Sequence, residues 1–147
     1  MMTLLNRVLY ESTPRNRFVT LFLARYDPET SELIYSSGGH NPMLVRRADG
    51  RCEWLATRGV GLGLTGGSRY QQESVLLAAG DVFVMYTDGV TEARSADGDE
   101  FGEERLVASL TGRGALGLTG SVLEAIDRFA EGAAQHDDIT LLVGRRT

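Results

Sequence analysis

The chain has 147 residues, and its single cysteine excludes an internal disulfide and a zinc finger, although one domain of this length needs neither to fold. The chain has no lysine, since all 15 of its lysine-or-arginine positions are arginine, and this excludes a P-loop lysine and a Schiff-base lysine. The formal charge of −5 argues against a nucleic-acid partner. Since the sequence shows neither a signal peptide nor an apolar run long enough to span a bilayer, we expect a cytoplasmic protein that does not associate with membranes.

The first eleven residues predict the end of a helix. Apolar side chains recur with helical spacing at Met1, Leu4, Leu5, Val8 and Leu9, which places them on one stripe. No capping residue precedes this pattern, so we expect the helix to be cut from a longer one and the chain to be incomplete at its N-terminus.

The period then changes to that of strands. A first hairpin is expected around the turn Asp27-Pro28-Glu29-Thr30 and a second around Ala48-Asp49-Gly50. Strands are predicted at residues 18–24, 33–35, 43–46, 53–55, 70–77, 82–86 and 139–143, and helices at 103–110 and 121–129, with Thr119 or Ser121 as the N-cap of the second helix. Strands grouped early and helices grouped late predict an α+β fold with mostly antiparallel pairing.

A glycine-rich segment, Gly61-Leu62-Gly63-Leu64-Thr65-Gly66, matches the GxGxxG pattern of dinucleotide-binding domains. That pattern binds a pyrophosphate only where it opens a helix. Residues 70–76 alternate like a strand, so a glycine loop between strands is the favoured interpretation and a dinucleotide-binding domain the remote one.

Two acidic positions adjoin apolar strands. Asp88-Gly89 follows residues 82–87, and it predicts either a hairpin turn or a carboxylate presented to a metal, with Gly89 allowing close backbone approach. Asp137-Asp138 precedes the last strand as either a solvated loop or a pair of oxygen ligands for Mg²⁺ or Mn²⁺, because a divalent cation favours adjacent like charges. On the metal hypothesis, the carboxylates of Asp88 and Asp137 come within about 6–8 Å of each other.

Two further residues have simpler interpretations. His40, within Gly38-Gly39-His40-Asn41-Pro42, is typical of a satisfied loop histidine, and Cys52 beside Trp54 is typical of a packed thiol. No Gly-x-Ser-x-Gly elbow is present, so a serine hydrolase is not indicated.

Taken together, these motifs resemble the metal-dependent PPM-type serine/threonine phosphatases of the protein phosphatase 2C superfamily. The resemblance runs from Leu4 to Val143 and is to the bacterial branch of the stage II sporulation phosphatase E and the sigma-B activating phosphatases. The motifs that carry it are Phe18-Val19-Thr20-Leu21-Phe22, Gly39-His40-Asn41-Pro42, Gly61-Leu62-Gly63-Leu64, Ala79-Gly80-Asp81, Tyr86-Thr87-Asp88-Gly89-Val90-Thr91-Glu92-Ala93, Phe101-Gly102-Glu103-Glu104-Arg105-Leu106 and Asp137-Asp138-Ile139-Thr140-Leu141. The family implies an αββα sandwich with a two-metal site between its sheets.

The resemblance also implies a chemistry and its residues. Asp88 and Asp137 match the family's metal-binding aspartates, and Gly89 and Asp138 belong to the same metal site. A hydroxide that bridges two Mn²⁺ or Mg²⁺ ions hydrolyses phosphoserine or phosphothreonine on a protein, here an anti-sigma-factor antagonist in a partner-switching pathway. Near the ligands or the substrate the family implies three further residues, His40, Thr87 and Glu92.

One departure from the family matters. The family's N-terminal Gly-Asp-aromatic-aromatic-Asp motif, whose aspartate bridges both metals, is missing from residues 1–147, so Asp88 and Asp137 alone are expected to bind metal weakly. Two hypotheses follow: a phosphatase domain truncated at its N-terminus, or a pseudophosphatase or binding fragment that docks the phosphoprotein without hydrolysing it. Truncation also predicts self-association or marginal stability, because it exposes apolar surface and an unpaired sheet edge.

Overall fold

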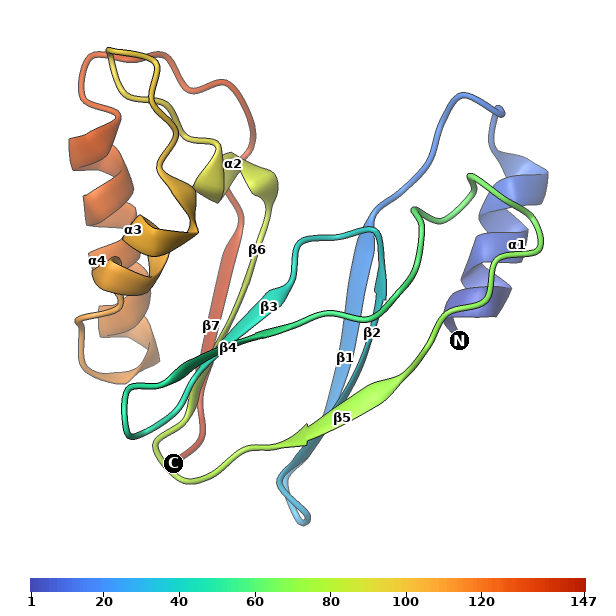
Figure 1. The fold of residues 1–147 in the computed structure, drawn as a ribbon, viewed down its shortest axis with the longest axis horizontal. Helices are drawn as coiled ribbons and strands as arrows, with labels where there is room; N and C mark the ends of the chain where they lie inside the picture. The colour runs from blue at the N-terminus through green and yellow to red at the C-terminus, as the bar shows by residue number, and fades with distance from the viewer. The chain divides into compact units, whose positions relative to one another are not determined.

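The computed structural model describes all residues, 1–147, and the chain divides into two compact units (Figure 1). The first unit consists of residues 1–43 and 54–78, and the second of residues 44–53 and 79–147. Each unit contains an antiparallel sheet and at least one helix, so the predicted α+β class with antiparallel pairing is confirmed. None of the helices is long and apolar enough to cross a membrane.

The first unit is built on a three-stranded sheet in the order β1-β2-β5. The predicted first hairpin is confirmed as β1 (Leu21–Asp27) and β2 (Glu32–Gly38), and its turn is closed by Asp27 Oδ1, which accepts hydrogen bonds from the next backbone amides. The third strand, β5 (Glu73–Leu76), pairs with β2 and is shorter than the predicted strand at 70–77. The first strand starts later than predicted because Val19 pairs instead with Leu62, as an isolated bridge.

The helix of this unit, α1 (Met2–Ser12), confirms the helical prediction but buries an unexpected face. The apolar stripe is largely exposed, with Leu4 at 61% and Val8 at 53%, while Met2 and Asn6 are buried. The Asn6 side chain donates to the Thr65 carbonyl at 2.9 Å and accepts from the Gly63 amide and the Tyr70 hydroxyl at 2.9 and 3.0 Å. A polar side chain therefore fastens α1 to the glycine loop, which is not followed by a helix as dinucleotide binding would require.

The second unit is built on a four-stranded sheet in the order β4-β3-β6-β7. Its strands are β3 (Met43–Arg46), β4 (Cys52–Leu55), β6 (Val82–Tyr86) and β7 (Leu141–Arg145), of which Met43 and residues 54–55 fall in the first unit. Its helices are α2 (Asp88–Thr91), α3 (Gly102–Ser109) and α4 (Gly114–Phe129). Strand and helix side chains share one core, whose buried members are Leu44, Val82, Val84, Tyr86, Val90, Phe101, Leu106, Leu110, Leu118, Val122 and Ile126. Cys52 is partly buried against this core, as expected of a packed thiol.

The start of the second long helix was predicted wrongly. The helix α4 begins at Gly114, and neither Thr119 nor Ser121 caps it, because both hydroxyls donate to carbonyls of the preceding turn, at 3.0 Å each. The glycines of its first turns lower helix propensity, but burial of Leu118 against the sheet overrides that preference.

A buried ion pair closes the end of the second unit at which β6 begins. Asp81 is 1% exposed, and its carboxylate accepts hydrogen bonds from Arg47 Nη1 and the Ala48 amide, both at 2.9 Å. The same guanidinium makes two bonds of 2.9 Å to Glu53 of β4, and these hold the pKa of the Glu53 carboxyl below its usual range. One arginine thus ties the β3–β4 hairpin to the start of β6.

Candidate metal centre

The two predicted metal-binding segments meet at one end of the four-stranded sheet (Figure 1). Asp88 follows β6 as the first residue of α2, a short helix that the sequence did not predict, and Asp137-Asp138 lies just before β7. Since β6 and β7 are antiparallel neighbours with Tyr86 opposite Leu141, the exit from β6 and the entry to β7 lie side by side.

Thr87 fastens these segments together. Its hydroxyl donates to the Asp138 carbonyl at 2.9 Å and accepts from the Thr140 amide at 2.9 Å, and its own amide donates to the Thr140 carbonyl at 3.1 Å. Three hydrogen bonds from one residue therefore set the position of the Asp137-Asp138 backbone relative to the start of α2.

Gly89 allows the two segments to touch. A Cβ atom at this buried glycine would lie 2.5 Å from the Asp138 carbonyl oxygen and 3.4 Å from the Asp137 carbonyl carbon. Any side chain here would separate the segments, which gives Gly89 of the predicted metal site a role in backbone approach.

The carboxylates at this junction are exposed and lack cationic partners. Asp88 Oδ1 accepts from the Gly89 amide at 3.1 Å, and Asp137 Oδ1 accepts from the Asp138 amide at 2.7 Å. Neither Asp88 nor Asp137 forms an ion pair with arginine. Two unpaired carboxylates on touching segments form an acidic site that a hard divalent cation would neutralise.

The donor set is nevertheless small for a metal centre. No group of three or more acidic, histidine or cysteine side chains in the chain is placed to hold an ion. Mg²⁺ and Mn²⁺ take about six oxygen ligands, so two carboxylates are too few for the two adjacent ions that the family resemblance implies, and water would have to supply most of the ligands of even one ion.

Of the remaining predicted residues, Glu92 lies at the site, and His40 belongs to the other unit. Glu92 donates its amide to the Asp88 carbonyl at 2.8 Å and lines a pocket of about 480 Å³ together with Gly89 and Asp137. His40 belongs to the first unit, where its Nδ1 lies 3.2 Å from the Thr20 hydroxyl.

Two titratable residues that line this pocket were not predicted from the sequence. Asp127 and His136 line the same pocket, but they come from the end of α4 and the loop after it, and no local pattern marks them. Tyr86 is the buried last residue of β6, and burial together with the Glu103 carboxylate raises the pKa of its phenol. This phenol therefore stays neutral and contributes no charge to the site.

We expect Thr87→Val to weaken Mn²⁺ binding by about tenfold. This is the lower end of the loss of metal affinity that follows when the hydrogen-bonding partners around metal ligands are removed. The valine removes both side-chain bonds to residues 138–140 but keeps the size and β-branching of threonine. Manganese titration of the chain checks this, with Thr87→Ser as the control that retains the hydroxyl. Equal affinities of the valine variant and the wild type would mean that the Thr87 side-chain hydrogen bonds do not position the carboxylates.

Comparisons with known proteins agree on one family. A family model described as stage II sporulation protein E (SpoIIE) matches residues 1–147. The chain is 29% identical to the phosphoserine phosphatase RsbU of Bacillus subtilis over 145 residues, which is 97% of this chain and 43% of RsbU. It is 31% identical to the protein IcfG of Synechocystis over 129 residues, which is 85% of this chain and 20% of IcfG. The chain thus spans less than half the length of these two relatives.

A solved structure shows the same fold. The phosphatase domain of the cell fate determinant SpoIIE from Bacillus subtilis, presoaked with Mn, superposes with a TM-score of 0.71 at 19% identity. The match covers 99% of this chain and 63% of that one. The fold predicted from the family resemblance is therefore confirmed as that of this phosphatase domain.

Proposed function

Because the chain belongs to the stage II sporulation protein E (SpoIIE) family of PPM-type phosphatases, we propose that it contributes to the metal-dependent hydrolysis of phosphoserine or phosphothreonine on a protein. The observation that supports the proposal is the contact between the backbone at Thr87-Gly89 and the backbone of residues 137–140, next to the exposed carboxylates of Asp88 and Asp137. In this proposal residues 1–147 form one domain that lacks the family's Gly-Asp segment.

Asp88 and Asp137 would hold a Mn²⁺ or Mg²⁺ ion, and the manganese introduced into the SpoIIE phosphatase domain supports this class of ion. A divalent ion lowers the pKa of bound water and screens phosphoryl charge. The chain's own contribution is to hold the backbones that carry the two carboxylates in contact through Thr87; Asp138 adjoins Asp137, and Glu92 and Asp127 line the same pocket as Asp137.

The proposed substrate is a phosphorylated protein in the cytoplasm, of the anti-sigma-factor antagonist class implied by the family resemblance. RsbU, which matches nearly the whole chain, is a phosphoserine phosphatase, and this supports phosphoserine as the reacting group. The exposed carboxylates of Asp88, Asp137 and Asp138 would repel a phosphoprotein, and a bound divalent cation would offset this repulsion.

One observation favours a second function, a binding module that docks the phosphoprotein without hydrolysing it. With two carboxylates and no third ligand in place, a single ion retains mostly water, and nothing bridges two ions against their mutual repulsion. We therefore expect residues 1–147 alone to release little or no phosphate from a phosphoserine peptide in the presence of Mn²⁺.

A malachite-green assay across Mn²⁺ concentrations, with RsbU as the positive control, tests this expectation. Robust metal-dependent turnover by residues 1–147 would contradict it and would indicate that Glu92 or Asp138 completes the ligand set.

The exposed stripe of α1 predicts self-association of this chain. Leu4 and Val8 point into solvent, and β1 is an edge strand of its sheet, so both apolar surface and unpaired backbone groups are available to a second copy. Replacing Leu4 and Val8 together by glutamine is expected to shift sedimentation toward the monomer. A wild-type chain that sediments as a compact monomer and melts in one sharp transition would contradict this prediction.

A further inference from the structure

The second unit contains an arginine-lined pocket at the end of its sheet opposite the candidate metal centre. Strand β6 enters the sheet at Val82 and leaves it toward Asp88, while β7 starts after Asp138 and ends at Arg145. Figure 1 accordingly shows the end of β7 and the start of α4 at the far end of the unit from α2. A ligand in this pocket would not be the phosphoryl group at the metal.

The strand register places two of the arginines around one point. Arg46 lies opposite Val82 in the β3–β6 pair, and Val82 lies opposite Arg145 in the β6–β7 pair. Directly opposed residues share a face of the sheet, so both arginines flank Val82 on the face that packs against α4. Adjacent strands are about 4.8 Å apart, which puts the Arg46 and Arg145 Cα atoms about 10 Å apart. At this separation both guanidinium groups can reach one small anion.

The charge of this pocket is uncompensated. Its volume is about 330 Å³, and four arginines line it without a single carboxylate: Arg46, Arg47, Arg113 and Arg145. Only the Arg47 guanidinium is neutralised, by Asp81 and Glu53. That of Arg46 donates to the Leu110 carbonyl, and the first turn of α4 contributes no acidic residue.

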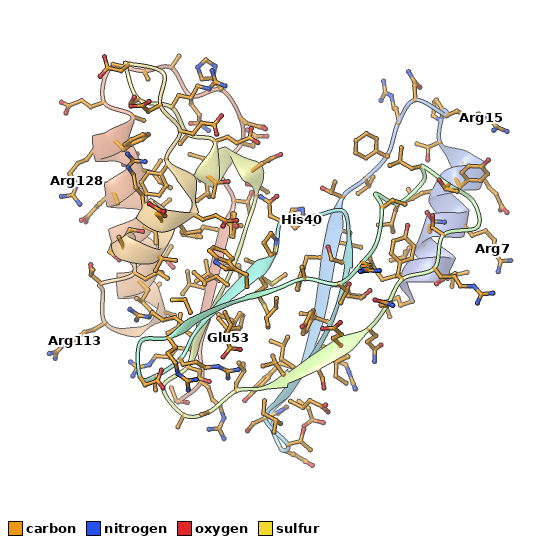
Figure 2. All side chains as sticks on the ribbon, in the orientation of Figure 1. Arg7, Arg15, His40, Glu53, Arg113 and Arg128 are labelled. Atoms are coloured by element: carbon orange, nitrogen blue, oxygen red, sulfur yellow. The ribbon has the colours of Figure 1, made fainter.

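The walls of the pocket are open to a ligand. Gly50, Gly80 and Gly112 contribute no side chains, and the buried side chain of Leu118 forms part of the lining. Figure 2 shows Arg113 extending outward from the start of α4, with Arg128 at the other end of the same helix. Arg113 lines the pocket from the start of α4, and Arg46 and Arg145 line it from the sheet.

We propose that this pocket binds a small phosphate-type oxyanion, either free phosphate or pyrophosphate or the diphosphate of a nucleotide. Guanidinium groups form paired, charge-assisted hydrogen bonds with phosphate oxygens, and such an ion would offset the repulsion between the like charges of Arg46 on β3 and Arg145 on β7, which flank β6. The pocket has room for such an ion but not for a folded partner.

Calorimetric titration of the chain in EDTA tests the proposal, since chelation removes any metal-bound anion. We expect saturable binding of pyrophosphate at one site per chain and a melting temperature that rises with its concentration. Arg145→Gln should raise the Kd about tenfold, the cost of losing one charge-assisted contact, and Arg145→Lys should raise it less. Arg128→Gln removes the same charge at the far end of α4 and should leave the Kd unchanged.

Titrations with phosphate and ADP identify the source of the anion. Tighter binding of ADP than of pyrophosphate would assign the pocket to a nucleotide, and the reverse order to a free phosphate or pyrophosphate; both support the site. Absence of saturable binding for all three ligands would overturn it. Equal weakening by Arg145→Gln and Arg128→Gln would also overturn it, by showing that only net charge matters.

Discussion

Replacing Asp88 by asparagine is expected to lower Mn²⁺-dependent phosphoserine hydrolysis by about a thousandfold or more, because a metal-activated water is lost with the metal. The suitable protein is a chimera in which a relative's segment carrying the Gly-Asp motif precedes Met1, since residues 1–147 assemble no group of three ligands. Asparagine keeps the shape of the side chain and one oxygen, so the loss reports the missing negative charge. Phosphate release from a phosphoserine peptide is the measurement.

Two controls make this result specific. Asp97→Asn removes an exposed carboxylate from the loop after α2 and should leave turnover unchanged, and circular dichroism melts should show that the Asp88 variant is folded. Unaltered turnover in Asp88→Asn would contradict its assignment. If the chimera binds its phosphoprotein but does not turn it over at any Mn²⁺ concentration, the binding-module hypothesis replaces catalysis.

Asp81→Ala is expected to destabilise the second unit by about 3–5 kcal/mol, the range observed when one partner of a buried ion pair is removed. The substitution removes one of the two carboxylates that bond the Arg47 guanidinium and deprives the Ala48 amide of its acceptor. For a chain of this length such a change lowers the melting temperature by about 10–16 °C.

Chemical denaturation of wild type, Asp81→Ala and Asp81→Asn measures the effect. The asparagine variant retains an acceptor for the Ala48 amide and should fall between the other two, while Asp97→Asn should match the wild type. A change below about 1 kcal/mol for Asp81→Ala would show that the pair contributes no more than a surface salt bridge.

Local patterns were sufficient where a segment's own composition determines its structure. The strand β6 has its predicted bounds because its apolar run is flanked by Gly80-Asp81 and by Thr87-Asp88, and the Asp27-Pro28-Glu29-Thr30 turn closes the first hairpin as predicted. Local patterns place Asp88 and Asp137 beside apolar runs, with a turn and a loop left open as alternatives; that their strands are neighbours depends on the pairing of β6 with β7, and their role as metal ligands stays a prediction.

What local patterns missed depends on contacts between distant segments. The α1 stripe predicted a buried face, yet the buried polar residue Asn6 fastens the helix, because its partners come from the glycine loop and Tyr70. The hydrogen bonds of Thr87 to residues 138–140 form only because β6 pairs with β7. The helix α4 starts earlier than predicted because Leu118 packs in the core, although the glycines of its first turns have low helix propensity.

The most direct test of the account is electron paramagnetic resonance titration of residues 1–147 with Mn²⁺, in which only free aqueous Mn²⁺ gives a strong signal. If Asp88 and Asp137 hold the same ion, Asp88→Asn and Asp137→Asn should each weaken binding by about tenfold or more, and the double variant should lose little beyond the single variants. Asp97→Asn serves as the matched acidic control. Unchanged Mn²⁺ affinity in Asp88→Asn, or losses that add fully in the double variant, would contradict a shared metal centre at the junction of β6 and β7.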